Sequence, residues 1–162
     1  MAPSRPICPV KHRRLRNIQV NDPYKAAADF ARAFGEAEYA MKRSGILRHN
    51  REVAQADWNA LAQNLGEDFF SAVVEMGIAK TLIGVPPRRL TSDLQWTPEV
   101  PVPITNVHEL IVQGVCRVRN SYLHGEKFTG GPDGQWARDI KLIKEAHAVL
   151  DVAMKWWLQA KD

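Results

Sequence analysis

The stretch CRVRNSYLHGEK, residues 116–127, carries two arginines, an asparagine and a histidine between an apolar run and a glycine. Arginine holds phosphate through charge-assisted hydrogen bonds, and histidine gives or takes a proton near neutral pH. Arg119 and His124 therefore suit the cleavage of RNA without a metal. In that reaction the ribose 2′-hydroxyl attacks the phosphate, while a base takes its proton and an acid protonates the departing 5′-oxygen.

This chemistry gives each polar residue of the stretch a candidate role. Arg119 would hold the phosphate and stabilise its growing charge, Asn120 would orient a side chain or the substrate, and His124 would transfer protons. Arg117 and Lys127 are candidate substrate-binding residues. The alternative is structural, because Arg119 and His124 at the end of a helix can simply neutralise the carbonyl end of the helix dipole.

A single His124 cannot easily act as both acid and base in one turnover. In a twofold-symmetric dimer the same surface meets itself, which would supply two copies of His124 and Arg119 to one cleft. The helix that precedes the motif fits this idea, because it carries a broad apolar face and a second, narrower stripe on the opposite side. The narrower stripe predicts a dimer interface formed by Val112, Cys116 and Leu123.

Hydrophobic periodicity predicts an all-α fold, an antiparallel bundle of four to five helices with the motif at the end of the third. The expected helical segments cover residues 22–45, 57–84, 106–125 and 136–157. The second should bend around Gly66, and the third should begin at Asn106 with Glu109 completing a capping box. His147 lies on the apolar stripe of the last helix and is interpreted as a packed core histidine, because no set of metal ligands accompanies it.

Two segments lie outside this helical pattern. Residues 84–105 contain five prolines, so we expect a long loop without regular structure that serves as a lid or a partner contact. Residues 1–21 form a basic, flexible arm with five cations and no acidic residue, which could bind phosphate backbones or be a solvated leader. The remaining residues, 22–162, should fold as one domain with a core of its own.

Composition limits the class of protein further. No stretch approaches the ~20 apolar residues of a membrane span, and the basic N-terminus lacks the apolar region of a signal peptide. The sequence therefore predicts a soluble, cytoplasmic protein. Its two cysteines, Cys8 and Cys116, indicate neither a disulfide framework nor a zinc site. We expect no metal and no cofactor.

The run RNSYLH, residues 119–124, at the end of the third helix of an all-helical domain resembles the motif of the HEPN superfamily (higher eukaryotes and prokaryotes nucleotide-binding). Members share an Arg, four to six residues, and then a His. Many are metal-independent endoribonucleases of toxin–antitoxin, phage-defence and RNA-processing systems, and they form composite active sites in dimers. The resemblance extends to the helical layout, but the matching residues are concentrated in positions 117–127.

Context separates this match from others with similar spacing. Residues 5–12, 43–49 and 117–124 also begin with Arg and end with His. Only the match that begins at Arg119 combines a polar residue after the Arg, an apolar run before it, a glycine after the His and a long amphipathic helix beyond.

The resemblance implies a dimeric endoribonuclease that acts on RNA as a toxin or phage-defence effector, with an antitoxin or a neighbouring defence protein as a further partner. Toxins of this type that are neutralised by a nucleotidyltransferase carry a Tyr two residues after the His, whereas this chain has Glu126. That form of regulation is therefore not expected. The alternative function is a non-catalytic HEPN module that binds RNA, a nucleotide or a protein partner.

Overall fold

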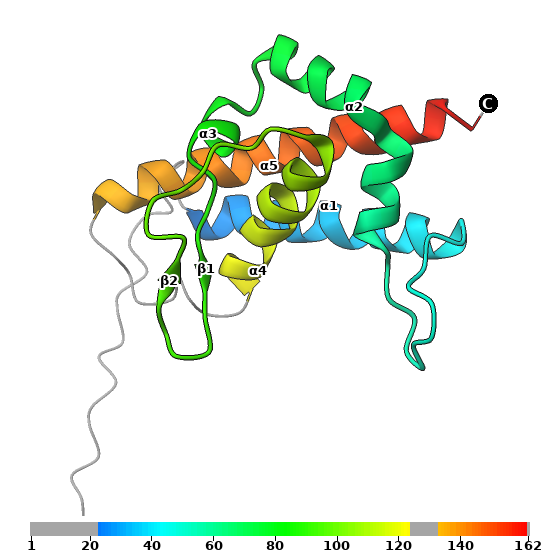
Figure 1. Cartoon of the computed structure of the whole chain (residues 1–162), viewed down its shortest axis with the longest axis horizontal. Helices are drawn as coiled ribbons and strands as arrows, with labels where there is room; N and C mark the ends of the chain where they lie inside the picture. Colours follow the sequence, from blue (N-terminus) through cyan, green and yellow to red (C-terminus); the bar gives the residue numbers. More distant parts are fainter. Residues whose placement is uncertain (1–22, 124–132, 162) are drawn as a thin grey trace, which may run out of the picture.

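The computed structural model describes residues 23–123 and 133–161. Two long helices, α1 (Pro23–Arg43) and α5 (Asp133–Gln159), run side by side through the molecule (Figure 1). The other helices cross or flank this pair, and within the described ranges the only sheet has two strands. The all-α prediction is therefore confirmed at the level of fold class.

The direction of α1 relative to α5 differs from the expectation. The sequence predicts an antiparallel bundle, whereas α1 and α5 run in the same direction in Figure 1. For two neighbouring helices to run parallel, the chain must return from the end of the first helix to the side of the molecule where that helix begins. Long connections make this return possible. The segments at 44–57 and 84–105 provide that length.

The helices α1 and α5 bury apolar stripes against each other. The buried residues of α1 are Pro23, Ala27, Phe30, Phe34, Ala37 and Met41. Those of α5 include Leu142, Ile143, Ala146, Val149, Leu150, Ala153 and Trp157. His147 adds to this contact, because its ring centroid lies 6.0 Å from that of Phe30, while its Nε2 lies 3.7 Å from Asp151 Oδ1. The ring is packed as predicted, but with 31% of the side chain exposed it lies at the edge of the core and is not the core histidine that the sequence predicts.

The helix α2 (Trp58–Met76) begins and bends where the sequence predicts. The Asp57 carboxylate accepts hydrogen bonds from the backbone N–H groups of Asn59 and Ala60, both at 3.1 Å. Gly66 bends the helix with φ 72° and ψ 172°. The predicted continuation to residue 84 is interrupted, because Gly77 adopts a left-handed conformation with φ 64° and ends α2.

A short helix, α3 (Lys80–Gly84), follows this break and is held by a buried carboxylate of α5. The backbone N–H of Leu82 donates to Glu145 Oε2 at 2.7 Å. Glu145 is only 9% exposed, and the hydrogen bond compensates part of the cost of burying its carboxylate. The contact therefore fixes α3 against α5.

The segments η1 (Glu109–Cys116) and α4 (Arg117–Leu123) form one continuous helix, which we call the η1–α4 helix. Its start confirms the predicted cap, because Asn106 Oδ1 accepts from the Glu109 N–H at 2.9 Å. The Glu109 carboxylate reaches the N–H of Thr105 at 2.8 Å. A second carboxylate, that of Glu67, accepts from the Val107 N–H at 3.3 Å.

The η1 part is a π-helix, with hydrogen bonds from residue i+5 to residue i, which the sequence does not predict. Its broad apolar face is nevertheless the core face, as expected. The buried members are Leu110, Ile111, Gly114 and Val115, followed in α4 by Val118. The helix packs against Leu82 and Ile104 at Gly114, where an added Cβ atom would lie 3.4 Å from side-chain atoms of both residues.

The proline-rich segment 84–105 contains a small hairpin that corrects the prediction of a loop without regular structure. The strands β1 (Arg89–Leu90) and β2 (Trp96–Thr97) pair antiparallel. They lie in the proline-free stretch between Pro87 and Pro98, where every residue keeps its N–H for pairing. The base of the segment is closed by a hydrogen bond from the Ile104 N–H to the Ile83 carbonyl at 2.8 Å.

The buried hydrogen bond between Glu145 and α3 leads to a prediction about stability. Glu145→Ala leaves the Leu82 N–H without its acceptor and should lower the free energy of unfolding by about 1–3 kcal/mol. Glu145→Gln keeps an acceptor oxygen and should cost less. Urea unfolding followed by circular dichroism measures both changes. Glu75→Ala, at an exposed site on α2, is the control and should shift the value by less than about 0.5 kcal/mol; equal losses at 75 and 145 would contradict the assigned role.

Candidate functional site

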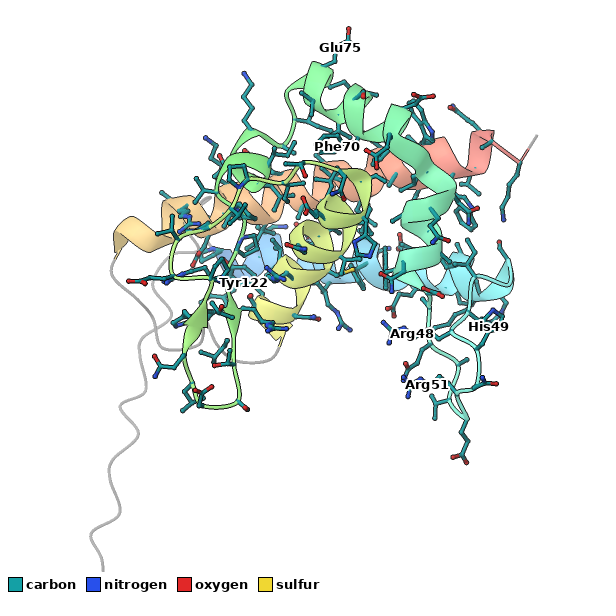
Figure 2. The ribbon with its side chains drawn as sticks, viewed as in Figure 1. Arg48, His49, Arg51, Phe70, Glu75 and Tyr122 are labelled. Atoms are coloured by element: carbon teal, nitrogen blue, oxygen red, sulfur yellow. The ribbon has the colours of Figure 1, made fainter. Side chains whose placement is uncertain are left out.

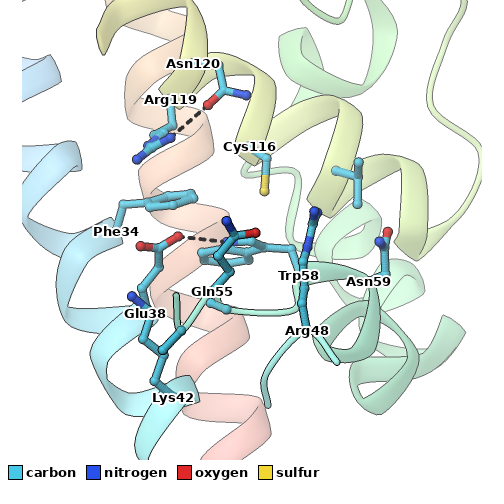
Figure 3. A pocket seen from close by; sticks show the side chains of 13 residues that line it. Phe34, Glu38, Lys42, Arg48, Gln55, Trp58, Asn59, Cys116, Arg119 and Asn120 are labelled. Atoms are coloured by element: carbon cyan, nitrogen blue, oxygen red, sulfur yellow. Dashed lines mark hydrogen bonds between the residues drawn. The ribbon is translucent and has the colours of Figure 1, made fainter. Parts of the chain in front are cut away.

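A cleft of about 480 Å³ opens beside the start of the predicted motif (Figure 3). Four segments form its walls: α1, the connection 44–57, the first turn of α2 and the η1–α4 helix. The lining residues are Phe34, Glu38, Lys42, Arg48, Ala54, Gln55, Ala56, Trp58, Asn59, Val112, Cys116, Arg119 and Asn120. Its volume falls within the range of small-ligand sites, roughly 300–1,000 Å³.

Two of the predicted catalytic residues, Arg119 and Asn120, lie together in this cleft. They follow Cys116 by three and four residues, and side chains at these spacings share one face of an α-helix. Val112 and Cys116, which the sequence assigns to a dimer interface, line the same cleft from the preceding π-helical turn. The narrower stripe of this helix therefore faces a cavity of its own chain.

The guanidinium of Arg119 keeps one buried donor without a partner among the described residues. Its guanidinium carbon lies 5.1 Å from the centroid of the Phe34 ring, and its Nη1 donates to Asn120 Oδ1 at 3.0 Å. Its Nε is buried and has no hydrogen-bond partner among the described residues. A guanidinium held in this way can donate to an oxyanion that enters the cleft.

A carboxylate on the α1 wall is held by an aromatic residue of α2. Trp58 Nε1 donates to Glu38 Oε1 at 3.2 Å, while the Trp58 ring lies against Phe34 with centroids 4.3 Å apart. Glu38 is the one carboxylate among the residues that line the cleft, which also include the cations of Lys42, Arg48 and Arg119. Three positive charges against one negative charge favour an anionic ligand.

The thiol of Cys116 lies among these charged groups but is not suited to nucleophilic chemistry. Burial raises its pKa to about 12, although the nearby cations of Arg119 and Arg48 act in the opposite direction and Glu38 adds to the increase. A thiol with this pKa is neutral near pH 7, and the thiolate is the reactive form. Cys116 therefore contributes a neutral wall to the cleft.

The connection 44–57 is folded onto the cleft by backbone hydrogen bonds. Leu47 and Ala56 form an isolated antiparallel bridge, and the Arg48 N–H donates to the Gln55 carbonyl at 2.9 Å. The Asp57 N–H closes the base by donating to the Ile46 carbonyl at 3.2 Å. This segment forms one wall of the cleft that Val112 and Cys116 line from the other side.

Of the other predicted site residues, the structure places only the side chain of Arg117. Arg117 donates from Nη1 to the Pro87 carbonyl at 3.2 Å and so faces the hairpin segment. Burial and the neighbouring Arg89 lower its pKa. His124 and Lys127 lie outside the described residues, as does the side chain of Leu123. The pairing of Arg119 with His124 in one site remains a prediction.

Several lining residues were not predicted from the sequence, notably Glu38, Arg48 and Asn59. Arg48 belongs to the basic stretch RHNR, which overlaps the rejected Arg-to-His match at 43–49. That local concentration of charge was the available signal. Asn59 gave none, because its role comes from a tertiary contact: its Oδ1 lies 2.7 Å from His108 Nε2 at the start of the η1–α4 helix.

Comparison with known proteins gives no match for this chain, whether with family models, curated proteins or solved structures. In the part of the chain that the structure describes, none of the helices combines the length and apolar composition that a membrane span requires. Nor do three or more His, Cys, Asp or Glu side chains gather there in a group that could hold a metal ion.

The raised pKa of Cys116 leads to a labelling prediction. At pH 8 the thiol should react with iodoacetamide about 10³-fold more slowly than an ordinary cysteine, because a pKa of about 12 leaves that much less thiolate. Mass spectrometry of the peptide that contains Cys116 measures the rate. The same protein unfolded in urea is the reference, and equal rates in the two states would show that the thiol is not protected.

Proposed function

We propose that this protein is a metal-independent endoribonuclease that binds a phosphate of RNA in the cleft beside Arg119. The observation that carries the proposal is the buried, unpartnered Nε of Arg119, in a cationic cleft, at the start of an Arg–polar–x–x–x–His motif. The donor fits a phosphate oxygen, and the motif supplies a histidine five residues further along.

Each group then has a defined part in the reaction. The guanidinium of Arg119 donates to a non-bridging phosphate oxygen, whose negative charge grows as the 2′-oxygen attacks. Asn120 holds the guanidinium through its Oδ1. The 2′-oxygen–phosphorus bond forms and the bond from phosphorus to the 5′-oxygen breaks, so the products carry a 2′,3′-cyclic phosphate and a 5′-hydroxyl. His124 takes the proton of the nucleophile or gives one to the leaving oxygen.

The second proton-transfer group comes, in this proposal, from the His124 of another copy of the chain. Twofold symmetry would bring two motifs to one composite site. Val112 and Cys116 would then form part of the wall of the shared cleft. Leu123 would lie nearer the contact between the two copies. The biological setting, a toxin or defence effector with an antitoxin or neighbouring partner, rests on the resemblance to the HEPN superfamily.

A binding module without catalysis is the second candidate. The charge of the cleft supports it, because Lys42, Arg48 and Arg119 would attract an anion whether or not a histidine faces it. RNA binding with steep salt dependence but no cleavage would favour this function.

The catalytic assignment predicts the effect of two substitutions. His124→Ala should reduce RNA cleavage by about 10²- to 10⁴-fold, and Arg119→Ala should act similarly through the lost phosphate contact. Wild-type products should carry a 2′,3′-cyclic phosphate, EDTA should have no effect, and DNA of the same sequence should survive because it lacks the attacking hydroxyl. Gel analysis of labelled RNA, and of labelled DNA for the last outcome, with purified protein measures all five outcomes.

The control for these variants is Arg32→Ala, at an exposed site on α1 where the side chain pairs with Glu36. It should leave cleavage unchanged, while circular dichroism verifies that every variant keeps its helices. Full activity of His124→Ala, or a requirement for added magnesium, would refute the catalytic assignment.

The composite site makes a separate prediction about mixed dimers. A heterodimer of wild type and His124→Ala, isolated through two different tags, should lose more than about 10-fold of the wild-type activity, because each turnover would need both histidines. A site complete within one copy predicts half of the activity instead. A monomeric mass by light scattering at micromolar concentration would also exclude the composite site.

A further inference from the structure

Positive charge is concentrated in residues 42–52, beside the cleft. This stretch contains four cations, Lys42, Arg43, Arg48 and Arg51, against Glu52 alone, for a net charge of +3. Residues 22–162 contain 17 basic and 18 acidic residues, a net charge of −1, so the rest of the domain sums to −4. The basic character of the domain is therefore local.

These cations lead from the cleft to the tip of the connection between α1 and α2. Lys42 and Arg48 line the cleft, and Arg51 is exposed beyond it. Figure 2 shows Arg48, His49 and Arg51 together on this connection. None of the four cations lies within 4.0 Å of a carboxylate oxygen of any residue that the structure describes. Within the described part of the chain these four charges therefore have no ion-pair partner.

Backbone hydrogen bonds shape this connection, so the points at which its cationic side chains leave the main chain are defined. The bridge between Leu47 and Ala56 holds the two sides of the turn together. Asn50 turns the chain at the tip with a φ of 57°, a conformation that asparagine adopts more readily than most residues. Binding would therefore require little ordering of the chain, which limits its entropic cost.

An exposed aromatic ring lies next to the same cations. Tyr39 is 62% exposed, and the guanidinium carbon of Arg43 lies 4.4 Å from its ring centroid. A basic surface interleaved with aromatic rings is the arrangement by which proteins hold single-stranded nucleic acid, since the cations follow the backbone and the rings stack on bases.

We propose that residues 39–51 form a track for single-stranded RNA that leads out of the cleft, with Lys42 and Arg48 nearest the bound phosphate and Arg51 at the outer end. The inference rests on the proposed function for the position of the scissile phosphate. The track itself concerns binding, and it can be tested without cleavage.

A 2′-O-methyl oligonucleotide separates the two questions, because it lacks the attacking hydroxyl. Its binding to the protein is measured by fluorescence anisotropy between 50 and 300 mM salt. Over this range each phosphate contact to a single strand contributes about 0.7 to the slope of log K against log salt, because binding releases counterions. The double variant Arg48→Ala/Arg51→Ala should weaken binding about 10-fold and reduce the slope of log K against log salt by about 1.4.

The matched control is Arg32→Ala/Arg88→Ala, which changes the net charge equally at exposed sites away from the track. It should leave affinity and slope close to those of wild type. Equal effects of the two double variants would overturn the proposal, since net charge alone would then explain the binding. Competition by polyglutamate as strong as that by RNA of equal charge would overturn the assignment to nucleic acid.

The outcomes also distinguish the track from the nuclease. If wild type cleaves no RNA but the track variant loses binding as expected, the proposed reaction is wrong and the track stands. If wild type cleaves RNA but the track variant binds like the control, the track is wrong and the nuclease stands. Tyr39→Leu should weaken binding without changing the salt slope, because stacking displaces no counterions.

Discussion

The cleft depends on one buried ring, that of Phe34. It lies 4.3 Å from the Trp58 ring of α2 and 5.1 Å from the Arg119 guanidinium of α4, measured to the ring centroids. Three segments far apart in the sequence therefore meet on one side chain of α1. Aromatic pairs add about 0.5–1.5 kcal/mol to the effect of burial, and cation–π contacts add a comparable amount. Trp58 in turn orients Glu38, so Phe34 and Trp58 together position both signs of charge in the site.

The geometry of the η1–α4 helix is the second constraint on the site. Its first turn is fixed by Asn106 and by the Glu67 carboxylate, and Gly66 bends α2 just before Glu67. The helix runs as a π-helix to Cys116 and becomes an α-helix at Arg117, two residues before the motif begins at Arg119. Segments of π-helix are rare and often occur at functional sites. Here the change of geometry coincides with the residues to which we assign chemistry.

Local signals made the helices predictable from the sequence. The helix start near Asp57, the bend at Gly66 and the cap at Asn106 each depend on residues within one or two turns, and the structure confirms all three. The hairpin at 89–97 has strands of two residues each, too short for a pattern of alternation. The direction of α5 relative to α1 depends on tertiary packing, which periodicity does not encode.

Only the part of the candidate site that lies within one short stretch of sequence was predictable. Arg119 and Asn120 could be found because they follow each other in one motif, whereas Glu38 and Arg48 join them only through the fold. The stripe of Val112 and Cys116 was correctly separated from the core face of its helix. The connection 44–57 forms a wall of the cleft that this stripe lines, and the sequence does not place this connection.

The free donor of Arg119 connects the energetics of the site with its use. A buried N–H without a partner costs about 1–3 kcal/mol, and the cost is higher for charged groups. The cation–π contact with Phe34 and the hydrogen bond to Asn120 offset part of that cost but leave Nε unsatisfied. An anion that accepts a hydrogen bond from Nε would remove the penalty. The nearby Cys116 thiol is neutral, so it would not pair with the guanidinium in place of that anion. In the proposed site, forming this hydrogen bond on binding would favour an anion over a neutral ligand of the same size.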